Sequence, residues 1–137
     1  MSAVKYPLSE NMPDRIKSAT GRRYPDLTVE AVATGDAEIA DFQISRETLA
    51  AQAEIAAGQG RDTLAANFQR GSELISVPDS EIFEVYELLR PGRAKDADEL
   101  LSKASYLRRT YRAEKVAELI EEAARIYAER NLFRRRY

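Results

Sequence analysis

The residues that first suggest chemistry are three carboxylates near the C-terminal end of the chain. Glu118, Glu121 and Glu122 share or adjoin one face of an expected helix, and paired carboxylates can do acid–base work or hold a divalent metal ion. Lys115 precedes Glu118 by three residues and Arg125 follows Glu121 by four, which is the spacing of ion pairs on an exposed helix. A catalytic carboxylate also needs burial to tune its pKa. The pattern therefore predicts a solvated, ion-paired face rather than a catalytic or metal site.

The composition removes most other catalytic chemistry. The 137 residues include no cysteine, no histidine and no tryptophan. Thiol nucleophiles and thiolate metal sites are thereby excluded, together with the side chain that most often acts as general base near neutral pH. Zinc, haem and iron–sulfur sites lose their usual ligands. Chemistry that uses only carboxylates, lysine or tyrosine is left open, but we expect no catalytic, cofactor-binding or metal-binding residue in this chain.

One basic cluster lies at the end of the sequence. Arg134-Arg135-Arg136, with Arg130 one turn earlier, could contact phosphates, and Phe133 or Tyr137 could stack on bases. The formal net charge is −2, however, and cations at a helix C-terminus also interact favourably with the helix dipole. The sequence therefore favours a protein with no nucleic-acid partner.

The apolar residues are spread over short segments. None of these approaches the roughly 20 residues that a membrane span needs, and the first residues lack the apolar region of a secretory signal. The absence of cysteine fits a reducing compartment. We expect a cytoplasmic protein with no membrane partner.

The first 27 residues are expected to form an extended arm. Pro7, Pro13 and Pro25 interrupt any regular period, and each proline fixes its own φ and biases the residue before it toward extended geometry. At most a turn of helix is expected around residues 14–19. Such an arm either wraps a partner or stays disordered, whereas residues 28–137 are expected to form a single helical domain.

Helical patterns begin after the arm. Thr28 and Gly35 are the predicted N-cap and left-handed end of a short helix, and residues 36–44 form a connector that Ile39, Phe42 and Ile44 are expected to anchor. Ser45 is the predicted N-cap of the next helix. Gly58-Gln59-Gly60 separates that helix from another over residues 61–75. The alanines and glycines of this pair favour close helix–helix packing over the alternative of a ligand groove.

Two further helical regions follow. Asp79 is the predicted N-cap of a helix that ends at Pro91-Gly92, and its core stripe consists of Ile82, Val85, Tyr86 and Leu89. Asp96 with Glu99 resembles a capping box at the start of residues 97–131, which we expect to form two helices with a break near 110–114, although one long helix is left open. The predicted fold is therefore all-α, with about four to six helices and no substantial sheet.

Segments distributed over nearly the whole chain share their order and spacing with one family. They include Tyr6-Pro7-Leu8, Ile44-Ser45-Arg46-Glu47-Thr48-Leu49, Gly60-Arg61-Asp62-x-Leu64-Ala65-x-Asn67-Phe68-x-Arg70, Val77-Pro78-Asp79, Tyr86-x-x-Leu89-Arg90-Pro91-x-Arg93 and Glu122-Ala123-Ala124-x-x-Tyr127-x-x-Arg130. From Tyr6 to Leu132 the chain thus resembles the small (gamma) subunit of the adenosylcobalamin-dependent diol and glycerol dehydratases.

The resemblance implies a role in a cytoplasmic hydro-lyase. Members of that family are heterohexamers with two copies each of a large (alpha), a medium (beta) and a small subunit. The (β/α)₈ barrel of the large subunit encloses the substrate and a monovalent cation, and adenosylcobalamin lies between the large and medium subunits. A radical mechanism converts a 1,2-diol to an aldehyde with loss of water. The small subunit is helical and non-catalytic, and it packs mainly on the large one.

The same resemblance leads us to expect an interface with the large subunit. The arm and the helix pair over residues 46–75 are the segments expected to dock, and certain arginines are expected to form charge-assisted bonds across the interface or to helix carbonyls within the chain. The candidate interface residues are Tyr6, Pro7, Leu8, Phe68, Arg70, Arg90 and Arg93.

Some alternatives stay open at the level of sequence. A standalone helical adaptor without catalytic activity is the main competing class. The resemblance does not separate propanediol from glycerol as preferred substrate, because it places the substrate pocket in another polypeptide, and it leaves the details of assembly open. Only five residues precede Tyr6, whereas microcompartment-associated relatives often carry an N-terminal extension there, so targeting through this subunit is not expected.

Overall fold

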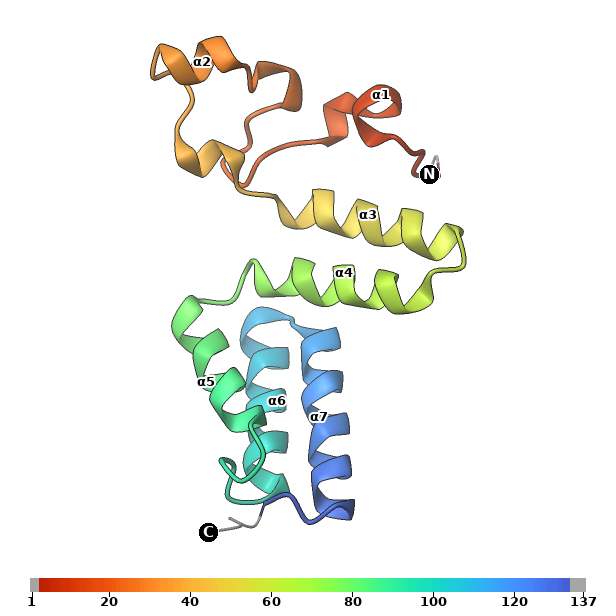
Figure 1. Cartoon of the computed structure of the whole chain (residues 1–137), viewed down its shortest axis with the longest axis vertical. Helices are drawn as coiled ribbons and strands as arrows, with labels where there is room; N and C mark the ends of the chain where they lie inside the picture. The colour runs from red at the N-terminus through yellow and green to blue at the C-terminus, as the bar shows by residue number, and fades with distance from the viewer. Residues whose placement is uncertain (1–2, 134–137) are drawn as a thin grey trace. The chain divides into compact units, whose positions relative to one another are not determined.

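The computed structural model describes residues 3–133, and this part of the chain is all-α. Seven α-helices and three 3-10 helices follow one another, and five of the α-helices are longer than ten residues (Figure 1). The described residues form no strand, and their only β-type contacts are two isolated bridges, Lys17 with Arg23 and Ser18 with Ile44. The predicted fold class is confirmed. No helix in this part of the chain is long and apolar enough to cross a membrane.

The contacts divide the chain into two compact units, which meet in sequence at Ser72 and Glu73. Within the first unit, short polar contacts tie residues 3–27 to the residues that follow them. The predicted division into an arm over residues 1–27 and a helical domain over residues 28–137 stays a prediction. That the arm wraps a partner stays a prediction.

The first unit begins with short helical turns and loops. Its elements before the longer helices are α1 (Leu8–Asn11), η1 (Pro13–Arg15), η2 (Tyr24–Asp26), α2 (Val29–Ala33) and η3 (Ile39–Phe42). The predicted cap of α2 is confirmed, since Thr28 Oγ1 accepts from Ala31 N at 3.1 Å and Gly35 has a φ of 75°. The arm is tied to the following segment by Ala19 N, which donates to Gln43 O at 2.9 Å, and by Thr48 Oγ1, which donates to Lys17 O at 3.3 Å.

Two antiparallel helices, α3 (Arg46–Gly58) and α4 (Asp62–Leu74), follow in the first unit (Figure 1). Ser45 Oγ accepts from Thr48 N at 3.1 Å, which confirms the predicted N-cap. Gly60 has a φ of 71° in the turn between the helices, a conformation that glycine adopts without strain. A Cβ at Gly71 would lie 3.1 Å from Leu49 Cδ2, so a glycine there permits the close approach of the two helices.

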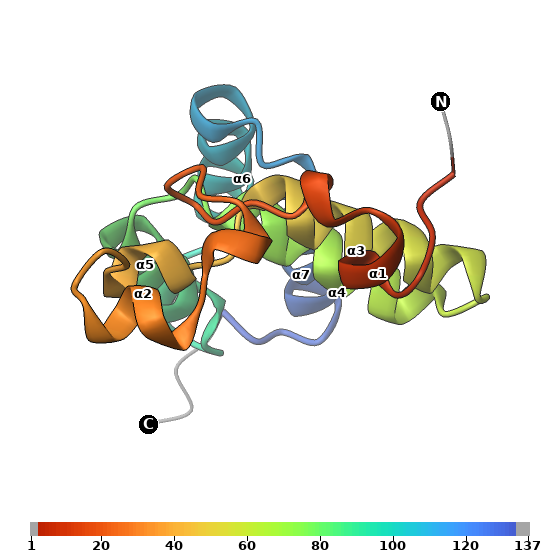
Figure 2. The ribbon, with the colours of Figure 1, turned by 90° about the horizontal axis from the view of Figure 1, so that it is seen from above.

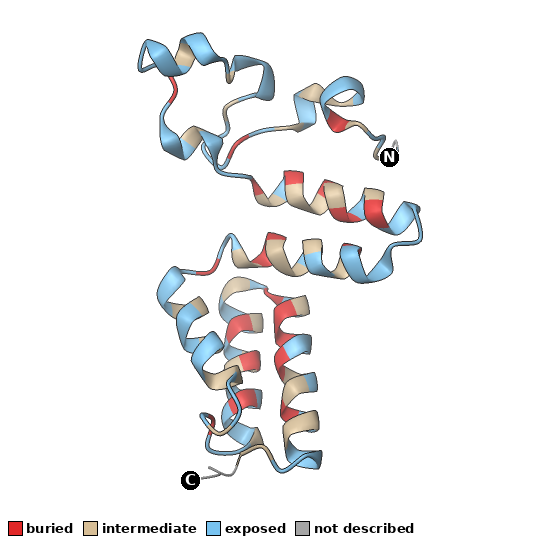
Figure 3. Ribbon diagram, in the orientation of Figure 1, coloured by how far each residue is buried: buried red, intermediate tan, exposed pale blue. Residues whose placement is uncertain are grey.

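The second unit contains α5 (Asp79–Leu89), α6 (Ala97–Tyr111) and α7 (Glu114–Glu129). Leu100, Leu107 and Ile120 are its fully buried large side chains, and the buried residues of α6 and α7 lie on the sides of these helices that face each other (Figure 3). Arg112 between these helices is in the left-handed region, with a φ of 53°. Residues 97–131 therefore form two helices with a break where the sequence predicts one.

The start of α5 and one residue of its stripe differ from the prediction. Pro78 is the N-cap, and Asp79 is the first helical residue with no side-chain cap recorded for the helix; the preset extended backbone of Pro78 moves the cap by one position. Tyr86 is 64% exposed rather than part of the core. The other stripe residues, Ile82, Val85 and Leu89, are half-buried against the core, so only a narrow face of α5 is covered.

Candidate partner interface

Of the three carboxylates that the sequence singles out on α7, Glu118 and Glu121 belong to surface ion pairs, whereas Glu122 has none among the described residues. Lys115 Nζ lies 2.9 Å from Glu118 Oε2, as predicted, but Glu121 pairs with Arg108 of α6 at 2.7 Å, and Arg125 pairs with Glu129 instead. The hydrogen bonds from Arg108 hold the pKa of Glu121 below its ordinary value. Within residues 3–133, no three Asp or Glu side chains come together as a metal ion would require.

The first unit contains a groove of about 1310 Å³. It is lined by residues of the arm from residue 5 to α1 and by residues of α3 and α4; Figures 1 and 2 both show α1 beside α3. Its lining consists of Lys5, Tyr6, Pro7, Leu8, Ser9, Asn11, Ile16, Tyr24, Thr48, Gln52, Ile55, Ala56, Gln59, Arg61, Leu64 and Phe68. We call this feature the arm–helix groove.

The arm–helix groove brings together four of the seven residues that the sequence nominates for an interface. Tyr6, Pro7, Leu8 and Phe68 all line it, although 60 residues separate Leu8 from Phe68 in the sequence. Leu8 is buried and Phe68 half-buried, whereas the Tyr6 side chain is 77% exposed. An aromatic side chain left so open at the edge of a groove is typical of an anchor for a protein partner.

The three nominated arginines do not belong to this groove. Arg70 donates to Asn67 Oδ1 one turn earlier on α4. Arg90 and Arg93, after α5, both lie near Glu87, with N···O distances of 3.1 Å and 4.0 Å. Their recorded bonds thus go to side chains of this chain rather than to helix carbonyls, and exposed pairs of this kind contribute little to stability. Their role at an interface stays a prediction.

A second set of exposed apolar side chains, on α2 and η3, was not foreseen from the sequence, and we refer to it as the α2–η3 platform. It consists of Val29 and Val32 on α2 with Ile39 and Phe42 on η3. Val29 is 87% and Ile39 88% exposed, and the other two are exposed as well. The expectation that Ile39, Phe42 and Ile44 anchor the connector is therefore wrong within the chain, since all three remain open to solvent. The signal that could have revealed the platform is the pair of valines three residues apart on a helix with no apolar segment nearby to cover them.

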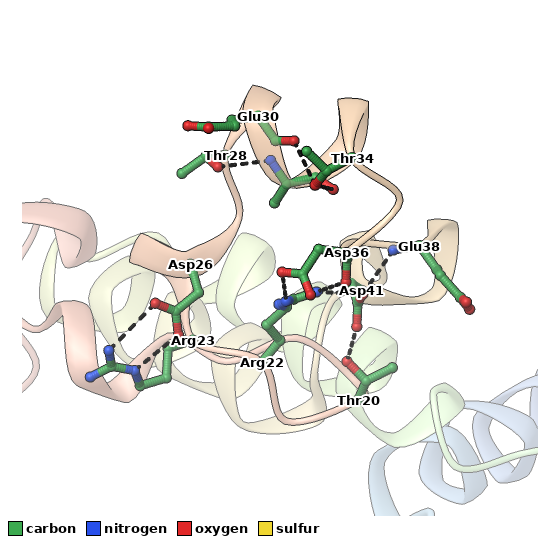
Figure 4. A network of polar contacts seen from close by, with 11 residues as sticks. Thr20, Arg22, Arg23, Asp26, Thr28, Glu30, Thr34, Asp36, Glu38 and Asp41 are labelled. Atoms are coloured by element: carbon green, nitrogen blue, oxygen red, sulfur yellow. Dashed lines mark hydrogen bonds and ion pairs between the residues drawn. The ribbon is translucent and has the colours of Figure 1, made fainter.

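The α2–η3 platform is held in shape by a polar network around Arg22 (Figure 4). Arg22 Nη2 lies 2.5 Å from Asp36 Oδ2, its Nη1 donates to the Asp36 carbonyl, and Nη1 also lies 3.2 Å from Asp41 Oδ2. Asp41 accepts further bonds from Thr20 Oγ1 at 2.6 Å and from Glu38 N at 2.9 Å. The bond from Thr20 and then that from Glu38 N, with the charge of Arg22, hold the pKa of Asp41 below its ordinary value.

The second unit carries a third exposed apolar feature on α5. Phe83 is 70% exposed, and Tyr86, three residues later on the same helix, is 64% exposed. Residues at this spacing share a helix face. The other side of α5 is fastened to α6 by Lys103, which contacts Glu81 and lies 2.7 Å from Glu84, so the aromatic pair projects from a fixed helix.

A buried carboxylate that the sequence did not single out supports the second unit. Glu73 is 7% exposed, and its two oxygens accept from Lys115 N and Val116 N at 2.9 Å each. These N–H groups lie in the first turn of α7, where no partner exists within the helix. Because Ala113 at the N-cap offers no side-chain acceptor, Glu73 takes over that task from 42 residues away.

Comparison with known proteins gives a consistent result. The model of the family described as dehydratase small subunit matches residues 1–134. The propanediol dehydratase small subunit of Citrobacter freundii is 44% identical over 125 residues, which cover 91% of this chain and 72% of that protein. The corresponding protein of Salmonella typhimurium is 43% identical with the same coverage.

Proposed function

Because the chain belongs to the dehydratase small subunit family, we propose that it is the non-catalytic small subunit of an adenosylcobalamin-dependent diol or glycerol dehydratase. In this role it packs on the large catalytic subunit in the cytoplasm and stabilises it. The enzyme is a lyase that converts a 1,2-diol, propanediol or glycerol, to an aldehyde. The assembly contains large (alpha), medium (beta) and small subunits, two copies of each.

The observation that carries this proposal is the amount of large apolar surface that the chain leaves open. Tyr6 at the arm–helix groove, the four residues of the α2–η3 platform and the aromatic pair on α5 are all exposed. Single exposed apolar residues are ordinary, but grouped ones mark sites of protein contact. In a multi-subunit protein, the other subunits can bury such surfaces.

The cofactors of the proposed enzyme are assigned to the larger subunits. When bound there, adenosylcobalamin supplies the radical that starts the loss of water. The monovalent cation is likewise assigned to the large subunit, and this chain is assigned the role of binding and stabilising that subunit.

The stabilisation follows from mass action. A partner that binds only the folded large subunit raises the free energy of its unfolding by an amount that grows with the ratio of partner concentration to Kd. Residues 3–133 contribute fixed surfaces to this binding, because α3, α6 and the short α2 are capped and the platform is held by Arg22.

Co-expression tests the proposal. The large and medium subunits, produced with and without this chain, are compared for soluble yield, thermal midpoint and diol dehydratase activity. We expect a lower yield or midpoint when the chain is omitted, and restoration when it is added back. A dehydratase that is equally soluble, stable and active without it contradicts the proposal, and a cooperatively melting monomer that does not bind the large subunit favours the standalone adaptor.

A further inference from the structure

The charges along the arm–helix groove are of one sign. Of its 16 lining residues, Lys5 and Arg61 are the charged ones, and none is acidic. This contrasts with the whole chain, in which 23 acidic residues exceed 21 basic ones. Both cations are exposed, and neither forms an ion pair with another described residue, whereas Arg22, Lys103 and Arg108 each have carboxylate partners. The groove is therefore an electropositive hollow on an acidic protein.

The helices that line the groove carry both apolar and hydrogen-bonding side chains. On α3 and its C-cap, Gln52, Ile55 and Gln59 follow each other at the spacing of one helix face. Arg61, Leu64 and Phe68 do the same at the start of α4. The side-chain amides of Gln52 and Gln59 make no hydrogen bond within residues 3–133, so they remain able to donate to and accept from the backbone of another polypeptide.

We propose that the arm–helix groove receives a segment of the large dehydratase subunit that carries an aspartate or glutamate next to apolar side chains. The inference rests on the proposed function and specifies which surface of this chain is used and which chemistry it recognises. The acidic side chain pairs with Lys5 and Arg61. The apolar side chains cover Leu64 and Phe68, and the backbone of the segment bonds to Gln52 and Gln59.

The apolar and the charged side chains of the groove make different contributions to binding. A few well-buried residues, often aromatic side chains or arginine, supply most of the affinity at a protein interface. Complementary charge speeds encounter and fixes the register in which the segment enters. Because one cation belongs to the arm and the other to the residue before α4, a carboxylate that contacts both also links the arm to the helices.

Charge reversal in the assembled enzyme tests the inference. Lys5→Glu with Arg61→Glu places two acidic side chains at the groove. The variant should weaken binding to the large subunit on the order of tenfold, because the groove then repels the acidic side chain of the partner segment instead of attracting it. The matched control, Lys95→Glu with Arg109→Glu, makes the same change in net charge at two exposed cations that form no ion pair with a described residue and do not line the groove. The control should bind as the unmodified chain does.

The salt dependence of binding gives a second readout. Added salt should weaken the binding of the unmodified chain and of the control more than that of the groove variant, because only the first two retain the attraction that salt screens. Equal binding of the groove variant and the control overturns the inference. If the unmodified chain itself fails to bind the large subunit, it is the proposed function that fails, so the two failures are distinguishable.

A cross-link identifies the occupant without relying on the charge variant. A photoreactive amino acid in place of Leu64, which lines the groove, is activated in the assembled dehydratase, and the attached peptide is sequenced. We expect a peptide of the large subunit with an Asp or Glu within a few residues of the attachment point. A peptide of the medium subunit, of a second copy of this chain, or one without an acidic residue contradicts the inference.

Discussion

The two units of this chain bury different kinds of residue. In the second unit Leu100, Leu107 and Ile120 form the centre of a continuous apolar core. In the first unit the buried hydrophobic residues are Leu8 and five alanines, at positions 37, 51, 53, 56 and 65. Large apolar residues such as Val29 and Ile39 remain in solvent there. The second unit is thus built on its own core, whereas the first depends on capping, small-residue packing and polar networks.

The first unit stands to gain more stability from a partner than the second unit does. Burial of a large aliphatic or aromatic side chain contributes roughly 1.5–3 kcal/mol, and the first unit has few such contributions within the chain. Its polar contacts lie mostly at the surface, where each contributes little to the free energy of unfolding. A partner that covers the arm–helix groove and the α2–η3 platform would supply the missing apolar contacts.

The largest effect is expected in the core of the second unit. Leu107→Ala removes a side chain that is 1% exposed and should lower the free energy of unfolding by about 2–5 kcal/mol through lost burial and a cavity. Leu101→Ala on the same helix, where the side chain is exposed, is the matched control and should cost far less. Urea titration of the purified chain measures both. Similar losses for the two variants would show that the core is not where the structure places it.

The next effect concerns the cap of α7. Glu73→Ala leaves Lys115 N and Val116 N without their acceptor and should cost about 1–3 kcal/mol, because these groups lose a hydrogen bond to a charged partner. Glu118→Ala, which removes an exposed carboxylate from the same helix, should change stability little. Urea titration again gives the comparison. A loss no greater than that of the control would mean that α7 does not rely on Glu73.

A smaller, local effect is expected from acid. The pKa of Asp41 is lowered in the folded chain. The contribution of its carboxylate to stability is therefore fully present above the unfolded pKa of about 3.9, and it is lost as the pH falls through the lower pKa of the folded state. Protection of residues 29–42 from amide exchange should therefore decrease in acid. The ion-paired carboxylates Glu81 and Glu121 of the second unit also have lowered pKa values, but the apolar core behind them does not titrate.

The control for this experiment is Asp41→Asn, which should already show weak protection of the platform at neutral pH and little further loss in acid. Exchange rates are corrected for the intrinsic effect of pH on each amide. Equal loss of protection in both units at the same pH would contradict the contrast between them.

The smallest effect on stability is expected at the exposed aromatic pair. Phe83→Ser should change the free energy of unfolding of the chain by no more than about 0.5 kcal/mol, because substitutions at open surface positions are usually nearly neutral. The same variant should bind the larger dehydratase subunits less well if the α5 face is covered in the assembly. A large loss of stability in the isolated chain would instead make Phe83 part of a core.

Local signals in the sequence predicted much of the fold. The caps at Thr28, Ser45 and Asp96 and the break between α6 and α7 were predictable because each depends on neighbouring residues. The predicted burial of Tyr86 was wrong, because a residue at the edge of an apolar stripe can lie either inside or outside the covered face of its helix. Such a choice depends on how much of the helix the neighbouring elements cover.

The candidate interface could be predicted only in part. Tyr6-Pro7-Leu8 was recognisable from the sequence, and the structure adds that Phe68 lines the same groove. The single sign of charge in the groove was not predictable, because Lys5 and Arg61 meet there only through the fold. The contact of Glu73 with α7 was invisible for the same reason. The cluster Arg134-Arg135-Arg136, with Tyr137, lies outside the described residues, so its predicted lack of a nucleic-acid role stays a prediction.

Amide hydrogen exchange, measured on the chain alone and in the purified assembled dehydratase, shows which parts of the chain a partner covers. We expect assembly to slow exchange strongly in the first unit, over the arm, α2, η3 and the groove helices, and to change the core of α6 and α7 much less. Unchanged exchange in the first unit on assembly, or failure of the chain to enter the dehydratase at all, would contradict this expectation.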